Sequence, residues 1–266
     1  MEDKTKRLKY YAKIWLIMSK NAFMAMLSNK GAFFIFLTGK IIRFFFFVIF
    51  LVFFVQEAGG VVGYSTQQML FIFLTFNLID VIGQFMFREV YRFRPLLVTG
   101  DFDLILAKPA NALFRVLMGG ADIIDLVTIP PLLLAVIIVG ARLNPTPTDI
   151  VLYIILIVNG LIIVTAFHIA VIAMGILTME IDHSIMIFRD MLNLGKFPVE
   201  IYRQPLRAIL TFLIPVGIMI TLPARAFMGM ATPLGVAASF IVAALSIFVA
   251  LKFWNRALKS YTSASS

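Results

Sequence analysis

Long apolar runs separated by short polar segments make up most of this chain. A helix needs about 20 apolar residues to cross a hydrocarbon core about 30 Å thick. Five runs meet this length, and a sixth, 208–222, is shorter and interrupted by Pro215. The five long runs are Phe33–Val55, Met69–Phe87, Ile123–Ala141, Ile150–Thr178 and Leu234–Trp254. The pattern predicts a multi-pass bundle of membrane-spanning helices.

The composition supports this pattern. Of the 266 residues, 61% are hydrophobic and 14% are charged, whereas soluble domains carry about 25% charged residues. The chain has no cysteine, which excludes thiol chemistry and cysteine-held metal sites, and its two histidines leave little room for a histidine cluster. We therefore expect an all-α integral membrane protein with no catalytic residues, no metal site and no affinity for nucleic acid.

Lysine and arginine alternate between successive connections. The N-terminal arm, 1–30, holds seven of them, the connection between the first two runs holds none, and the 88–118 loop holds five. Basic residues accumulate on the cytoplasmic side of membrane proteins. We therefore expect a cell (inner or plasma) membrane protein with both termini and the 88–118 loop in the cytoplasm. An even number of spans follows, and six, within residues 31–258, is the expected number.

The stretch 180–222 is the ambiguous part of the pattern. Its first part, 180–207, contains four basic and four acidic residues. Two interpretations are open. Either this part forms a cytoplasmic amphipathic hairpin and 208–222 is the fifth span, or Ile181–Phe197 is a polar fifth span and the proline-broken part after it dips into the outer leaflet. Charge counting favours the first interpretation, because charged side chains within a span are costly.

The N-terminal arm has helical periodicity. Its apolar stripe and its lysines lie on different faces, which is typical of an amphipathic helix in the membrane interface. The arm lacks the features of a cleavable signal, so we expect a helix that either only anchors the chain or also contacts a cytoplasmic partner. The apolar stripe of the arm consists of Leu8, Tyr11, Trp15, Met18, Ala22 and Met26.

At the other end of the chain, 259–266 is expected to be a polar tail.

The 88–118 loop is too long for a simple connection, and loops of this length are usually functional. Asp101 is suited to begin a helix and Pro109 cannot continue one, so a short helix is expected over Phe102–Lys108. Its apolar side chains need a cover, which is either the membrane surface or a groove on a soluble partner.

This loop carries a resemblance to a known family. The run from Gly100 to Pro109, GDFDLILAKP, followed by Asn111, is similar to the cytoplasmic loop of ABC-2-type permeases, in the branch long listed as a family of unknown function. The words Phe197-Pro198, Ile214-Pro215-Val216 and Pro223-Ala224 recur there in the same order. The resemblance spans most of the chain.

The resemblance implies a six-helix fold like that of type V exporters and a role as the membrane half of an ATP-driven exporter. Such halves pair as homo- or heterodimers, and each docks on a separate ABC ATPase, two copies in all, through a short coupling helix. The arm 1–30 would be an interface helix, and a re-entrant hairpin would follow the fifth span, which favours the second interpretation of 180–222. The implied docking residues are Asp101, Phe102, Asp103, Leu104, Ile105, Leu106 and Lys108.

A second group of candidates lies within the spans. Asn77, Asp80 and Gln84 share one face of the second span because they are three and four residues apart. An intramembrane carboxylate is a functional candidate, but a hydrogen-bonded tie between helices is the alternative for Asp80. His168 lies alone in the fourth span. Arg189 lines a pathway only if 181–197 lies in the membrane.

Asp122 and Asp125 open the third span. Acidic groups are favoured at a helix N-terminus by the macrodipole, and both are also positioned to pair with Arg88 or Arg115. A structural role is therefore the simpler interpretation of the two aspartates.

The sequence permits three functions. No phosphate-binding loop occurs in the sequence, so a permease subunit would depend on ATP and Mg²⁺ bound by its partner ATPase and would itself be non-catalytic. An ion- or proton-coupled transporter would use Asp80, Asp122, Asp125 and His168, although matching inverted halves are not evident. A membrane enzyme acting on lipid would need convergent acid–base groups.

Overall fold

The computed structural model describes residues 2–262, and its long elements are all helices. Five of them are long and apolar enough to cross a membrane, or six if the bent pair described below counts as one span. Each of the five contains the apolar run that predicted it, so these spans are confirmed in number and position. They are α2 (Lys30–Glu57), α3 (Thr66–Phe87), α7 (Ile123–Ala141), α8 (Pro147–Thr178) and α12 (Pro233–Lys259).

Capping side chains fix where the spans begin. The Ser65 hydroxyl accepts a hydrogen bond from the Gln68 N–H and the Gln68 side chain accepts one from the Ser65 N–H, which is a capping box for α3. Thr146 and Asp149 form the same arrangement at the start of α8. Thr232 caps α12. These caps satisfy N–H groups that no helical turn can reach.

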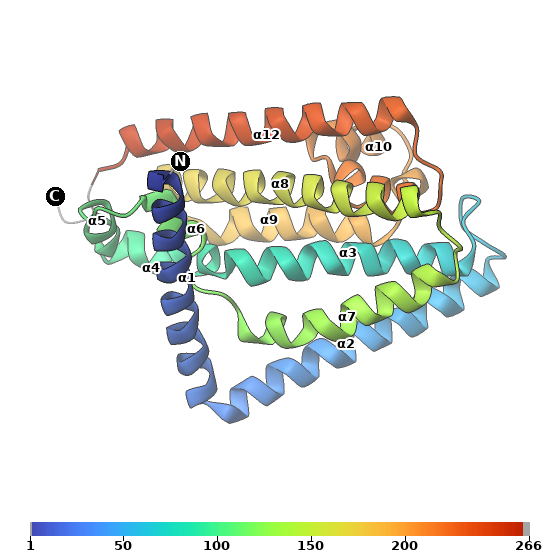
Figure 1. The fold of residues 1–266 in the computed structure, drawn as a ribbon, viewed down its shortest axis with the longest axis horizontal. Helices are drawn as coiled ribbons and strands as arrows, with labels where there is room; N and C mark the ends of the chain where they lie inside the picture. Colours follow the sequence, from blue (N-terminus) through green and yellow to red (C-terminus); the bar gives the residue numbers. More distant parts are fainter. Residues whose placement is uncertain (1, 263–266) are drawn as a thin grey trace.

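The spans lie side by side, and Figure 1 shows two different ends of the bundle. The connections 58–65, 142–146 and 228–232 meet at one end, which we call the outer end. The opposite, inner end carries the N-terminal helix, the last described residues and the 88–118 segment. That segment, the inner lobe, folds into η1 (Arg88–Arg92), α4 (Phe93–Val98), α5 (Asp101–Leu106) and α6 (Ala112–Leu117).

The N-terminal helix α1 (Glu2–Ser28) lies across the inner end, crosswise to the spans (Figure 1). The predicted stripe faces the protein in part: Tyr11, Trp15 and Met18 are half-buried, whereas Leu8 is exposed. The sequence pattern did not identify Ser19, which is buried and whose hydroxyl accepts a hydrogen bond from the Ala121 N–H at 3.1 Å.

One residue separates α1 from α2. Asn29 caps α2, and its side chain accepts a hydrogen bond from the Ala32 N–H at 3.0 Å. The Tyr11 hydroxyl accepts one from the Asn111 N–H of the inner lobe at 3.2 Å. The helix therefore contacts both the first span and the inner lobe.

The ambiguous stretch runs along the bundle and does not form a hairpin at the inner end. α9 (Asp182–Asn193) begins beside the inner lobe, where Asp182 pairs with Arg94 at 3.4 Å. The chain continues through η2 (Leu194–Lys196) and η3 (Val199–Ile201), and Glu200 then pairs with Arg225 at 2.8 Å near the outer end. Residues 182–200 thus pass from one end of the bundle to the other.

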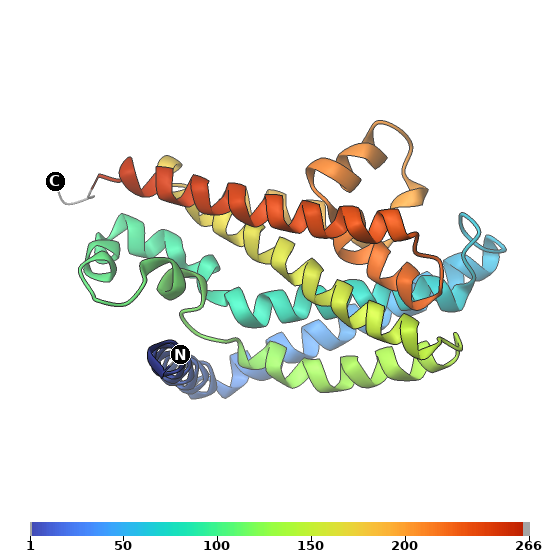
Figure 2. The same ribbon diagram turned by 45° about the horizontal axis from the view of Figure 1, so that its top comes forward.

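A bent pair of short helices follows, shown in orange in Figure 2. Its two arms are Leu206–Leu213 and Gly217–Phe227, and the chain bends by 71° between them, at a break that contains Pro215. A proline has no N–H to donate and cannot continue a helix, so the break falls where the sequence predicted it. The pair consists of α10 (Leu206–Ala208), η4 (Ile209–Leu213), η5 (Gly217–Thr221) and α11 (Leu222–Phe227).

The outer end is closed by buried aromatic and charged groups. The Phe227 ring stacks on Phe71 of α3 with 4.4 Å between centroids and packs edge-on against Tyr153 of α8. Tyr64, in the 58–65 connection, is buried next to Glu200. Burial, and then the neighbouring Glu200 carboxylate, raise the pKa of Tyr64 to about 12, so this hydroxyl stays protonated.

The close approach of α8 to the bent pair yields a stability prediction. A Cβ at Gly160 would lie 2.8 Å from the backbone oxygen of Met219, so Gly160→Ala should lower the free energy of unfolding by about 1–3 kcal/mol through overpacking. Gly39→Ala in α2 is the matched control, because its Cβ would meet no atom within 4 Å. The midpoint of thermal unfolding in detergent should fall for the first variant only. Equal midpoints would contradict this packing.

Candidate functional site

The short helix predicted in the inner lobe exists as α5, but its side chains divide into two sets. Phe102 is fully buried between the rings of Phe93 and Tyr261, each 5.1 Å away between centroids, and Ile105 is buried as well. Leu104, in contrast, is 61% exposed. Phe102 and Ile105 therefore position the helix, and a docking partner can reach only the exposed residues of the predicted set: Asp101, Leu104, Leu106 and Lys108.

Ion pairs hold the inner lobe against the bundle. The Arg94 guanidinium lies 3.0 Å from a Glu180 carboxylate oxygen and 3.4 Å from one of Asp182. Arg115 pairs with Glu89 at 3.0 Å within the lobe. The first two contacts tie α4 to the α8–α9 connection and to the start of α9, and the third ties α6 to η1.

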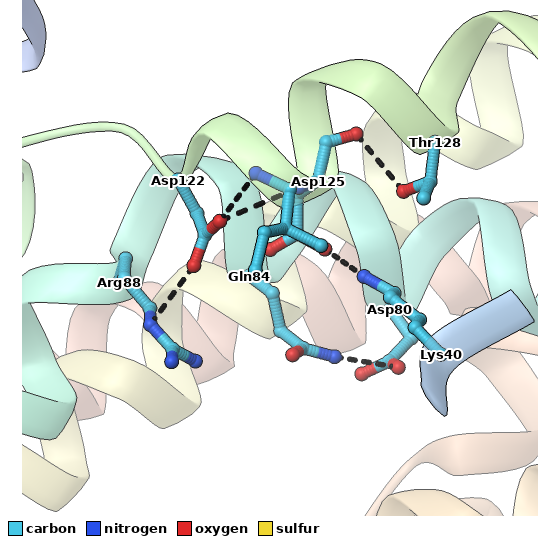
Figure 3. A network of polar contacts seen from close by, with 8 residues as sticks. Lys40, Asp80, Gln84, Arg88, Asp122, Asp125 and Thr128 are labelled. Carbon is cyan, nitrogen blue, oxygen red and sulfur yellow. Dashed lines mark hydrogen bonds and ion pairs between the residues drawn. The ribbon is translucent and has the colours of Figure 1, made fainter. Parts of the chain in front are cut away.

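A polar network lies where α2, α3 and α7 approach one another (Figure 3). Asp122 caps α7 by accepting hydrogen bonds from the Ile124 and Asp125 N–H groups, and its other oxygen pairs with Arg88 at 3.0 Å. Lys40 of α2 donates to the buried carboxylate of Asp125. These pairings support the structural interpretation of both aspartates.

A second part of this network lies on α3, one turn before Arg88 in the sequence. The Gln84 amide donates to a carboxylate oxygen of Asp80 at 2.7 Å. The same Asp80 carboxylate lines a cavity of about 300 Å³ between α2, α3, α7 and α9. The cavity wall includes Asn77 and Arg189 among its polar residues, together with a set of phenylalanine rings from α2 and α3.

The cavity brings together three of the polar candidates from the spans. Asn77, Asp80 and Arg189 line it, and Gln84 lines an adjoining cleft of about 560 Å³ that opens toward the inner end. His168 lies elsewhere. It is buried on α8, where its Nδ1 lies 2.8 Å from the Val164 carbonyl oxygen and its ring packs against aromatic side chains.

Three basic residues of this cavity were not among the predicted candidates: Lys40, Arg43 and Lys196. A basic residue within or beside an apolar run is the signal that could have identified them. Lys40 and Arg43 interrupt the first apolar run, and Lys196 lies in the stretch 180–222, whose location the sequence left open.

A multi-pass membrane protein with a polar cavity between its spans and a folded lobe at one end has the architecture of a transport subunit. A comparison with protein-family models matches residues 40–265 to the family described as ABC-2 family transporter protein. The chain belongs to this family, which confirms the resemblance found in its loop. The family is that of non-catalytic membrane permeases and implies association with an ABC ATPase. No curated protein and no solved structure matches the chain.

Proposed function

We propose that this chain is one half of an ABC exporter and docks on its ATPase through the exposed residues of α5. The observation that carries the proposal is the two-sided α5. Phe102 and Ile105 fix this helix to the bundle, and Leu104 remains exposed. An exposed apolar side chain on a fixed helix is suited to enter a hydrophobic groove on a partner. The inner end, with both termini, would then lie in the cytoplasm of the cell membrane.

Two such chains, identical or different, would face each other in the membrane, and two ATPase copies would bind ATP and Mg²⁺. α2 supports this pairing because only three of its residues are buried, while many of its apolar side chains are exposed, Phe46 and Ile49 among them. The fifth crossing would be 182–200, and the bent pair would be re-entrant from the outer side. Closure of the ATPases would push α5 and rock the spans.

The secondary-transporter hypothesis gains no support from the geometry. Asp122 and Asp125 line the adjoining cleft, but both are held in ion pairs, with Arg88 and Lys40. His168 lines neither the cavity nor this cleft, so it shares no pathway with the aspartates.

The test of the proposed function is reconstitution with the ABC ATPase encoded beside this chain. We expect the tagged permease to co-purify with this ATPase and, in liposomes, to raise its rate of ATP hydrolysis. Liposomes that contain the permease alone should show no transport driven by an ion gradient. Activity of the isolated chain under an ion gradient, or failure to bind the ATPase, would refute the proposal.

A further inference from the structure

The charge of the cavity between α2, α3, α7 and α9 is strongly positive. Its lining contains four basic residues and one acidic residue, Asp80. Of the four, Lys40 is paired with Asp125. Among the side chains of residues 5–262, no carboxylate lies at ion-pair distance from the other three: Arg43, Arg189 and Lys196.

These three cations line the cavity without being fully buried: Arg43 is exposed, and Arg189 and Lys196 are half-buried. Arg43 stands at the middle of α2, 13 residues after Lys30 and 14 before Glu57. Arg189 lies over the Tyr91 ring at 5.8 Å, and Lys196 lies over the Phe47 ring at 5.1 Å. Cation–π contacts contribute only about 0.5–2 kcal/mol, and they do not neutralise the charge. The arrangement therefore leaves positive charge for a ligand to neutralise.

The rest of the cavity wall is aromatic. Phe47 stacks on Phe73 with 4.6 Å between ring centroids, and Phe44 stacks on the same ring at 5.8 Å. Ile41 and Phe45 line the cavity and are also 43% and 59% exposed. They are four residues apart on one face of α2, so the cavity opens sideways onto an apolar surface.

We propose that this cavity binds an amphiphile with an anionic headgroup. Arg43, Arg189 and Lys196 would neutralise a phosphate or carboxylate, and a guanidinium presents paired donors that match either group. At about 300 Å³ the cavity lies at the lower end of ligand-pocket volumes of about 300–1,000 Å³. It therefore suits a headgroup, whose apolar tail leaves between Ile41 and Phe45. This inference rests on the proposed transport function and names its substrate class.

The binding test uses the full chain in dodecyl maltoside, an uncharged detergent. Dodecyl phosphate, dodecylphosphocholine and dodecyltrimethylammonium share one tail length and differ in head charge, and inorganic phosphate supplies the head alone. By equilibrium dialysis, dodecyl phosphate should bind at least tenfold more tightly than any of the other three. Equal affinity for the three amphiphiles, or equal affinity for inorganic phosphate, would overturn the inference.

A second arm separates a two-chain lipid from a single-chain amphiphile. The chain is placed in phosphatidylcholine nanodiscs with a few per cent of phosphatidic acid, and the retained lipids are measured by native mass spectrometry. Enrichment of phosphatidic acid would support the headgroup assignment and identify a lipid as the source. If phosphatidic acid is not enriched, selective binding of dodecyl phosphate would support a single-chain ligand. If phosphatidic acid is not enriched and dodecyl phosphate does not bind selectively, the inference is overturned.

Single variants distinguish this site from general charge effects. Arg43→Gln, and separately Lys196→Gln, should weaken dodecyl phosphate binding about tenfold, whereas Arg142→Gln, in the exposed outer connection, should not change it. Asp80→Asn removes the acidic residue of the lining and should strengthen binding about threefold or more. A misfolded variant cannot bind more tightly, so an unchanged or weaker affinity of Asp80→Asn would contradict the proposal.

Binding to the isolated chain needs no ATPase, so the two proposals can fail separately. If the ATPase co-purifies but the three amphiphiles bind equally, only the substrate class is wrong. If dodecyl phosphate binds selectively but no ATPase associates, only the docking role is wrong.

Discussion

Replacing Leu104 by aspartate should abolish co-purification with the partner ATPase. Leu104 is the most exposed apolar side chain of α5, and burying a leucine side chain contributes about 1.5–3 kcal/mol. Its loss corresponds to at least about a tenfold weaker complex, and a charged replacement adds a desolvation cost. The measurement is the dissociation constant of the detergent-purified pair.

The matched control is Val62→Asp. Val62 is 53% exposed in the outer connection and has a φ of 53°, a conformation that aspartate tolerates. It should leave ATPase binding unchanged. Deletion of 101–109 is a poorer test, because it would also remove Phe102 from its place between Phe93 and Tyr261. Full binding by Leu104→Asp, with normal thermal unfolding, would exclude α5 as the docking helix.

Replacing Lys40 by methionine should destabilise the membrane bundle by about 3–5 kcal/mol, because breaking a buried ion pair leaves an uncompensated charge. The stranded group is the carboxylate of Asp125, which is 2% exposed. Unfolding by sodium dodecyl sulfate, followed by circular dichroism, measures the loss.

The pair also permits a double-mutant comparison. Lys40→Met combined with Asp125→Leu removes both charges and should recover most of the stability, because replacing a buried pair by apolar groups is often neutral. Lys20→Met, on the exposed face of α1, is the control and should have no effect. If the double variant is no more stable than the single one, the ion pair is not the cause of the loss.

The five long spans were predictable because hydrophobic length alone defines a crossing helix. Pro215 also marked the break of the bent pair, since the missing N–H acts locally. These features depend on residues close together in the sequence. The path of 182–200 did not follow from charge counting, because Lys196 lies over the Phe47 ring of α2 and Arg189 over the Tyr91 ring of the inner lobe.

The candidate site was predictable only in part. Asn77 and Asp80 are visible as a polar stripe on one helix, and they do line the cavity. The pairing of Lys40 with Asp125 joins residues 85 positions apart, and no local pattern encodes such a contact. The division of α5 into buried and exposed residues likewise depends on Phe93 and Tyr261, which come from other elements.

The junction at Asn29 has a mechanical consequence. A single residue links α1 to α2, and its side chain is occupied in capping α2. So short a link couples the two helices, so a rotation of α1 tilts α2. The tilt also moves the side opening of the cavity at Ile41 and Phe45.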